Sequence, residues 1–142
     1  MEKGTIKFNW EKHTLTFLNT ECCDTYGALE DWAHVAQYEI CYKTNKPSDR
    51  TTEFEAKVFC DLNCTLNDNG ELCAAAGLGL LYNIDIFDKY NVFLEKYKNK
   101  QKITPDFLQS YYELGKAWND PKYQNGTFDK TLQPKLLLEF FK

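Results

Sequence analysis

Cysteine and histidine are the residue types in this chain that could supply a nucleophile or bind a metal ion. Six cysteines and two histidines occur, at Cys22, Cys23, Cys41, Cys60, Cys64, Cys73, His13 and His34. A Cys–His nucleophile pair would need a thiol whose pKa is lowered by positive charge nearby. Glu21 and Asp24 place negative charge around Cys22-Cys23 instead. We therefore expect no catalytic residue among them and free thiols throughout.

The spacing of the cysteines and histidines also argues against a metal site. Zinc ligands usually occur in pairs separated by two to four residues, and the pair formed by Cys60 and Cys64 comes nearest to that pattern. In a strand these two side chains would lie roughly 13 Å apart on one face. We expect no bound metal and no cofactor.

Carboxylates are the remaining groups that could do chemistry, and several occur close together. The pairs are Glu30 with Asp31, Asp61 with Asp68, and Asp85 with Asp88. A glycosidase or a magnesium-dependent nuclease would hold two or three such acids in a cleft. Solvated surface charge is the commoner outcome of this spacing, and no catalytic motif accompanies it. The sequence therefore favours a protein that is not an enzyme.

The distribution of charge along the chain is its most informative feature. The net charge is −4, but residues 13–42 and 58–88 each carry −5, whereas residues 89–142 carry +4. Charge of one sign gathered on a surface attracts partners of the opposite sign. Arg50 is the only arginine among 17 basic residues. Since arginine is the usual reader of base edges, specific nucleic-acid recognition is not expected.

Composition and hydropathy indicate an ordinary globular protein. The 142 residues are 43% hydrophobic and 15% aromatic, which is sufficient for one packed core. The longest apolar run, residues 72–81, is too short to cross a bilayer, and residues 1–10 lack the apolar run of a signal peptide. We expect a single domain over residues 1–142, located in the cytoplasm and not associated with a membrane.

Alternating hydrophobicity predicts strands in the N-terminal half. Residues 5–10 and 14–18 alternate across a short polar link and predict a β-hairpin with one buried face. Residues 35–43 and 53–60 alternate in the same way on either side of the turn-forming residues 45–49. We expect these two runs to pair as antiparallel strands.

Helical spacing dominates the C-terminal half. Residues 84–97 and 104–118 each show an apolar stripe, and Thr104 followed by Pro105 is a typical helix start. Residues 71–81 predict a buried helix that begins near Gly70, with a strand as the alternative, and Thr131 could cap a last short helix. Strands followed by helices predict an α+β fold, with an antiparallel β-sheet from the N-terminal half packed against the C-terminal α-helices.

The predicted binding site combines the acidic residues with aromatic side chains near them. Tyrosine and tryptophan are enriched at the energetic centres of protein interfaces, and acidic side chains around them would suit a basic surface. The predicted partner-binding residues are Asp24, Tyr26, Glu30, Asp31, Trp32, Glu39, Asp61, Asp68, Glu71, Asp85 and Asp88. This prediction requires the two acidic stretches to converge into one face.

The chain resembles the immunity proteins of bacterial polymorphic toxin systems. The resemblance lies in its size, in its acidic residues around Glu30-Asp31 and Asp85-Asp88, and in its preference for lysine over arginine. These include the systems of contact-dependent growth inhibition. The resemblance implies an inhibitor that binds and blocks a basic protein, above all a nuclease toxin, and it implies no particular fold. The alternatives are a small hydrolase with a carboxylate or Cys–His site, and a regulatory module that binds a small ligand.

Overall fold

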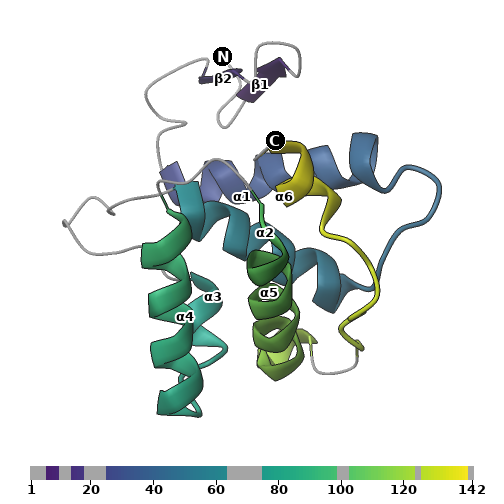
Figure 1. Ribbon diagram of the computed structural model, residues 1–142. Coiled ribbons are helices and arrows are strands. Elements are labelled where there is room, and N and C mark those ends of the chain that lie inside the picture. Colours follow the sequence, from purple (N-terminus) through teal and green to yellow (C-terminus); the bar gives the residue numbers. More distant parts are fainter. Residues whose placement is uncertain are drawn as a thin grey trace.

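The computed structural model describes residues 6–9, 14–17, 25–63, 75–98, 103–123 and 126–140, and helices dominate this part of the chain (Figure 1). The α-helices are α1 (Thr25–Ala36), α2 (Asp49–Asn63), α3 (Ala75–Leu78), α4 (Ile84–Tyr97), α5 (Pro105–Ala117) and α6 (Lys135–Phe140). A π-helix, η2 (Gln37–Cys41), extends α1, and the 3-10 helix η3 (Pro121–Tyr123) follows α5.

The predicted α+β fold is wrong. Residues 35–43, predicted as a strand, form the end of α1 and the π-helix, and residues 53–60, predicted as its partner, lie inside α2. No sheet from the N-terminal half packs on the C-terminal helices within the described part of the chain. The described segments pack helix against helix instead, around a single hydrophobic cluster.

The alternation in residues 53–60 was misleading because α2 is buried on nearly all sides. Its buried side chains include Phe54, Val58 and Phe59, but also the polar Glu55. Because Glu53, Glu55 and Lys57 alternate with apolar residues, this stretch resembles a strand with one polar face, although Glu55 is buried with the apolar side chains. Ser48 starts the helix by accepting a hydrogen bond from the Thr51 amide on its hydroxyl oxygen at 3.3 Å.

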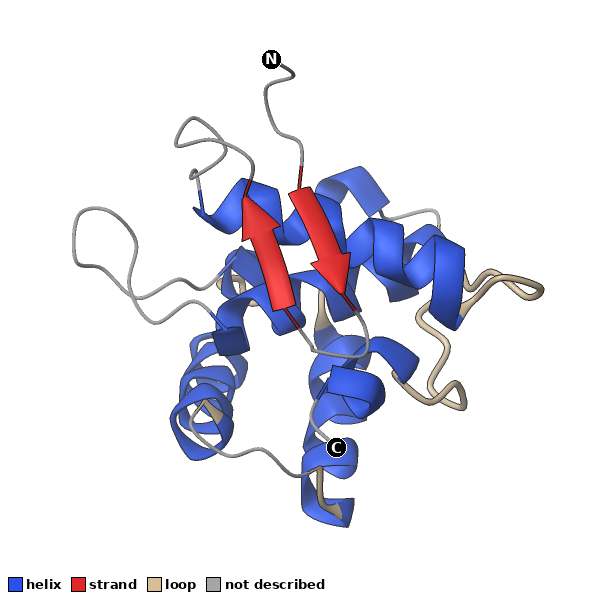
Figure 2. Cartoon of the chain, turned by 90° about the horizontal axis from the view of Figure 1, so that it is seen from above, coloured by secondary structure: helices blue, strands red, loops and turns tan. Residues whose placement is uncertain are grey.

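The first predicted hairpin is present as a backbone pairing. Strands β1 (Ile6–Asn9) and β2 (Thr14–Phe17) run antiparallel, with Ile6 opposite Phe17 and Asn9 opposite Thr14. Figure 2, a view from above, shows the two paired strands in front of the helices. The prediction that one face of the hairpin is buried concerns side chains outside the described part.

The helices are arranged in two groups that share the core. In Figure 1, α1 and α2 lie across the molecule, while α4 and α5 run side by side away from them. The aromatic ring of Phe54, from α2, is within 6 Å of the rings of Tyr111, Trp118 and Phe128, measured between centroids. These contacts join α2 to α5 and to the segment that follows it.

The C-terminal helix predictions hold best where local capping signals are strong. Helix α4 has the predicted bounds, and the Thr104 hydroxyl accepts a hydrogen bond from the Phe107 amide at the start of α5, at 3.2 Å. The final helix differs, because α6 begins at Lys135 and Thr131 does not cap it. Thr131 donates from its backbone and its hydroxyl to Asp129.

The region predicted as a helix from Gly70 contains the short α3, and residues 64–74 lie outside the described segments. Gly79 follows α3 and lies against the indole of Trp118, so closely that a Cβ atom at Gly79 would overlap the ring. The Gly79 carbonyl accepts a hydrogen bond from the Asn119 amide at 2.9 Å. This close approach fastens the α3–α4 turn to the end of α5.

Candidate protein-binding surface

Exposed apolar and acidic side chains occur together on one side of α1 and the π-helix. Asp31, Val35 and Glu39 are exposed and separated by four residues each, a spacing that keeps side chains on one face of a helix. Val35 is 57% exposed and Tyr38 is 37% exposed. We call Asp31, Val35, Tyr38, Glu39 and Ile40 the α1 surface.

The π-helix explains why three consecutive residues project from the molecule. The Tyr42 amide donates to the Gln37 carbonyl at 2.7 Å, which closes the wide turn of a π-helix. Gln37 is fully buried, whereas the intervening Tyr38, Glu39 and Ile40 are exposed. Single π-turns within helices are often found at functional sites.

Contacts with neighbouring side chains hold the exposed tyrosine in place. The Tyr38 ring stacks on the His34 ring, with centroids 5.9 Å apart and an angle of 12° between the planes. The ammonium group of Lys46 lies over the Tyr38 ring, 4.7 Å from its centroid. An aromatic side chain fixed in this way loses little conformational freedom when a partner binds it.

Beneath this surface, a network of charged side chains joins α1 to α2. Lys57 lies 2.7 Å from Glu30 and 3.9 Å from Glu53. The Nε2 atom of His34 lies 3.1 Å from the Glu53 carboxylate and 4.0 Å from that of Glu30. Because these four side chains are half-buried, their interactions are screened less than those of a fully exposed pair.

The hydrogen bonds of this network determine the charge of His34. The Gln37 amide nitrogen donates to the Thr52 carbonyl and to Glu55, so its amide oxygen must be the atom that faces His34 Nδ1, at 3.0 Å. In the protonated ring, Nδ1 donates to Gln37 and Nε2 donates to Glu53, so these two acceptors favour the imidazolium form. The hydrogen bond to Glu53 raises the pKa of His34 above 6.5, against the opposing effect of burial.

The two carboxylates and two cations of the network neutralise one another. Burial would raise the pKa of Glu53, but the hydrogen bond and charge of His34 and the charge of Lys57 lower it below 4.5. Burial lowers the pKa of Lys57, but the hydrogen bond and the charge of Glu30 raise it by more. The pKa of Lys57 therefore lies above its usual value of 10.5. Glu30, a predicted partner-binding residue, is thus already paired with Lys57.

This network also contains a set of atoms with the dimensions of a metal site. One ligand atom each from Glu30, His34 and Glu53 lie within 4.8 Å of one another. A metal ion bound here would have to displace the proton that the protonated His34 ring shares with Glu53. Lys57 supplies positive charge to both carboxylates. We assign the cluster to ion pairing between helices.

A second polar network lies deeper, around the carboxylate of Glu55. Glu55 is 1% exposed and accepts hydrogen bonds from Gln37 at 2.8 Å, from the Tyr42 hydroxyl at 2.9 Å and from the Leu136 amide at 3.1 Å. Burial raises its pKa to about 7, although these hydrogen bonds favour the charged form. The two networks meet at Gln37 and hold the π-helix against α2 and α6.

Two of the predicted binding residues belong to the core. Trp32 is buried, and its ring packs on that of Phe59 with centroids 5.2 Å apart. Asp61 is fully buried; it accepts a hydrogen bond from the Tyr90 hydroxyl at 2.5 Å and one from the Ala76 amide at 3.0 Å. Neither side chain is available to a partner protein.

The remaining predicted residues that the structure describes do not form one face. Asp31 and Glu39 are exposed on the α1 surface, whereas Asp85 and Asp88 are exposed near the start of α4, at the end of that helix remote from α1 (Figure 1). Asp24, Asp68 and Glu71 and the side chain of Tyr26 lie outside the described part of the chain.

Two apolar members of the α1 surface, Val35 and Ile40, were missed by the sequence analysis. Both lie in the run that was interpreted as a strand, where their exposure could not be recognised. In a helix, Val35 lies four residues after Asp31 and four before Glu39, so the three share one face. This spacing is the signal in the sequence that could have indicated that Val35 is exposed.

The alternative of a hydrolase with a Cys–His site gains no support from Cys41, the described cysteine nearest to His34 in the sequence. Burial raises the pKa of the Cys41 thiol to about 12, so this thiol is protonated at neutral pH and is a poor nucleophile. Cys41 is a free thiol. Cys22, Cys23, Cys64 and Cys73 lie outside the described segments, so the predictions made for them stay predictions.

No family model, no curated protein and no solved structure matches this chain. Among the described residues, every helix is too short or too polar to cross a membrane.

Proposed function

We propose that this protein binds and blocks a basic surface of another protein through its α1 surface. One observation carries the proposal: the exposed carboxylates of Asp31 and Glu39 flank the exposed side chains of Val35 and Tyr38 on one side of α1 and the π-helix. Apolar and aromatic anchors surrounded by charge are typical of protein interfaces. The proposed role involves no catalysis by this chain.

The rigidity of the surface supports the same proposal. The ion pairs of Lys57 and His34 and the buried hydrogen bonds of Gln37 connect the α1 surface to α2. A surface ordered before binding loses less conformational entropy in the complex. Because the network neutralises its own charges, Asp31 and Glu39 are the carboxylates of the α1 surface that remain for a partner.

The partner class that fits best is a nuclease, since a nuclease active site must be positively charged to attract phosphates. Carboxylates presented by an inhibitor would accelerate encounter with such a cleft and then exclude the nucleic acid. This proposal places the protein in the cytoplasm, where a nuclease toxin would have to be neutralised.

The test begins with affinity capture from the source cells, followed by identification of the captured protein and measurement of its binding kinetics. Asp31→Lys combined with Glu39→Lys should slow association about tenfold or more at low ionic strength, because like charges would then oppose the partner. Tyr38→Ala should mainly accelerate dissociation, because a central contact is lost. A captured nuclease should lose activity when the protein is added.

A charge-matched control separates this surface from general electrostatics. Glu95→Lys combined with Asp106→Lys makes the same change in net charge at exposed positions on α4 and α5. This variant should associate nearly as fast as the unaltered protein. Equal slowing by both double variants, or a captured partner with an acidic binding surface, would contradict the proposal.

A further inference from the structure

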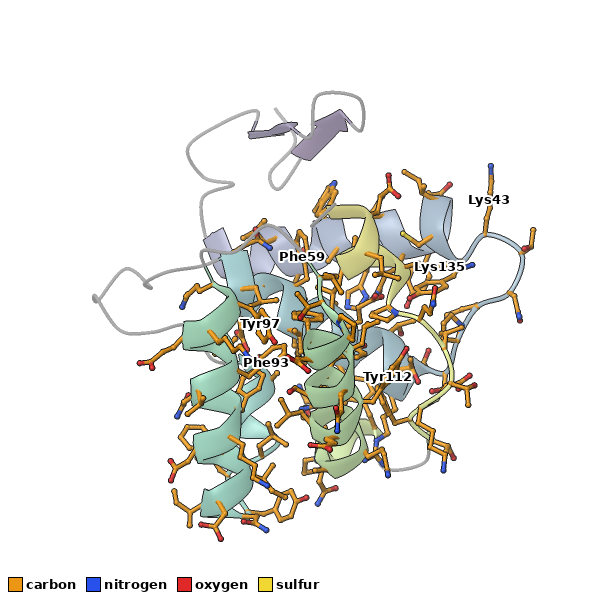
Figure 3. The ribbon with its side chains drawn as sticks, viewed as in Figure 1. Lys43, Phe59, Phe93, Tyr97, Tyr112 and Lys135 are labelled. Atoms are coloured by element: carbon orange, nitrogen blue, oxygen red, sulfur yellow. The ribbon has the colours of Figure 1, made fainter. Side chains whose placement is uncertain are left out.

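A groove between α4 and α5 forms a second surface, remote from the α1 surface. Its volume is about 830 Å³, and its floor includes Phe93, Tyr97 and Leu114. Figure 3 shows Phe93 and Tyr97 on the side of α4 that faces α5. The rim on the α4 side carries charged residues together with Val92, which is 63% exposed.

The rim residues of α4 form a straight line along the helix. Asp85, Lys89, Val92 and Lys96 are separated by four, three and four residues, so they share one face. With a rise of 1.5 Å per residue, this line extends over about 16 Å. The Lys96 ammonium lies 5.3 Å from the Tyr97 ring centroid, which places it over the floor of the groove.

The charges on this line change sign along its length. Asp85 and Asp88 lie at the start of α4, and Lys89 and Lys96 lie farther along it. Among the described residues, none of these four side chains forms an ion pair. Glu113 of α5 is a further acid in the lining of the groove. A uniformly basic partner would be attracted by the three acids but repelled by Lys89 and Lys96, so this groove matches such a surface less well than a partner that also changes sign.

The order of charged and apolar residues along α4 is instead complementary to the same residues of a second, antiparallel copy. Asp85 and Lys96 lie at equal distances from the midpoint between Tyr90 and Asn91, and Lys89 and Val92 are symmetric about the same point. Two α4 helices packed antiparallel across a twofold axis at that midpoint would place each Asp85 opposite the Lys96 of the other copy. In the same register, each Lys89 stem would cover the exposed Val92 of the other copy.

We infer that the occupant of this groove is a second copy of the chain, packed antiparallel along α4. A twofold interface uses the same patch on both copies, so a residue and its partner exchange roles across the axis. One register satisfies both the ion pairs and the apolar contacts. A contact centred on one helix pair buries less area than a typical permanent dimer, so we expect dimerisation to depend on protein concentration and salt.

Sedimentation equilibrium of the full chain over a range of concentrations, at low and high salt, tests this inference. Asp85→Lys or Lys96→Glu alone would place like charges opposite each other twice in the dimer, and each should raise the dissociation constant about tenfold or more. The double variant Asp85→Lys with Lys96→Glu exchanges the charges. It should restore the dissociation constant to within about threefold of the original value, since opposite charges face again.

Asp106→Lys is the matched control for Asp85→Lys, because Asp106 is an exposed acid in the first turn of α5 and does not line the groove. It should leave dimerisation unchanged. Thermal melting of each variant verifies folding; if Asp85→Lys lowers the melting temperature, Lys96→Glu alone decides the outcome. A monomeric protein at every concentration, single variants that dimerise normally, or a double variant that stays weakened would each overturn the inference.

Discussion

The Glu55 carboxylate of α2 accepts a hydrogen bond from the backbone amide of Leu136, the second residue of α6, at 3.1 Å. This contact joins two residues that are 81 positions apart in the chain. It supplies an acceptor for an amide at the start of α6, where a helix has none of its own. The same carboxylate binds Gln37 and Tyr42, so one buried acid connects α2, α6 and the end of α1.

Replacement of Tyr42 by phenylalanine tests the strength of this buried network. The Tyr42 hydroxyl donates to Glu55 at 2.9 Å and accepts from the Lys135 amide at 3.1 Å. Its loss should lower the free energy of unfolding by about 1 to 2 kcal/mol, because a buried donor and acceptor lose a partner. Urea denaturation measures the change. Tyr38→Phe is the control at an exposed position and should cost less than about 0.5 kcal/mol.

The stability of the protein should fall as the pH rises from about 5 to 8. Glu55 has a pKa of about 7 in the folded protein, compared with 4.5 for an unperturbed glutamate. The folded state therefore binds more protons between these values, and deprotonation favours unfolding, by on the order of 3 kcal/mol. His34 acts in the same direction, because its raised pKa stabilises the fold below pH 6.5 and this contribution is lost above the folded pKa.

Glu53 acts in the opposite direction but in a lower range. Its pKa lies below 4.5, so its contribution to stability is present above that pH and is lost in more acidic solution.

Urea unfolding at pH 5.5 and pH 8 measures the pH dependence attributed to Glu55. The free energy of unfolding should be lower at pH 8, and Glu55→Gln should remove most of this difference. A wild-type protein that is more stable at pH 8, or a Glu55→Gln variant with an unchanged pH dependence, would contradict this assignment.

The charge of His34 can be observed directly. In an NMR titration, the imidazole of His34 should have a pKa above 6.5, and Glu53→Gln should return the pKa towards that value, since the hydrogen bond to Glu53 is the main cause. Glu39→Gln removes a nearby exposed carboxylate without touching His34, and it should leave the titration unchanged. If both variants gave the same pKa for His34, the ion pair between His34 and Glu53 would not be the cause of the raised pKa.

Gly79→Ala should be strongly destabilising. The added Cβ atom would overlap Nε1 and Cδ1 of Trp118, whose indole is fully buried and cannot move aside freely. We expect a loss of about 2 to 3 kcal/mol in the free energy of unfolding, as for other overpacked cores. Gln109→Ala, at an exposed position of α5, should have an effect below about 0.5 kcal/mol. If the two variants lowered the free energy of unfolding by similar amounts, Trp118 would not limit the space at Gly79.

The sequence alone determined the helices whose signals are local. The bounds of α4 follow from an apolar stripe with polar residues on the other side. The start of α5 follows from Thr104 and Pro105, because a capping hydroxyl and a proline act on the first turn of their own helix. These interactions involve residues three or four positions apart, so they can be recognised without knowledge of the fold.

Only the tertiary structure decided which acidic residues are free and which segments are helical in the N-terminal half. Asp61 and Glu55 are buried where distant donors, including Tyr90 and Leu136, form hydrogen bonds with them, and the sequence does not show that these polar residues of α2 belong to its buried side. Glu30 is neutralised by Lys57, 27 residues away. A count of charges along the chain cannot anticipate such pairs, because hydrogen bonds and ion pairs depend on distances in space that the order of residues does not contain.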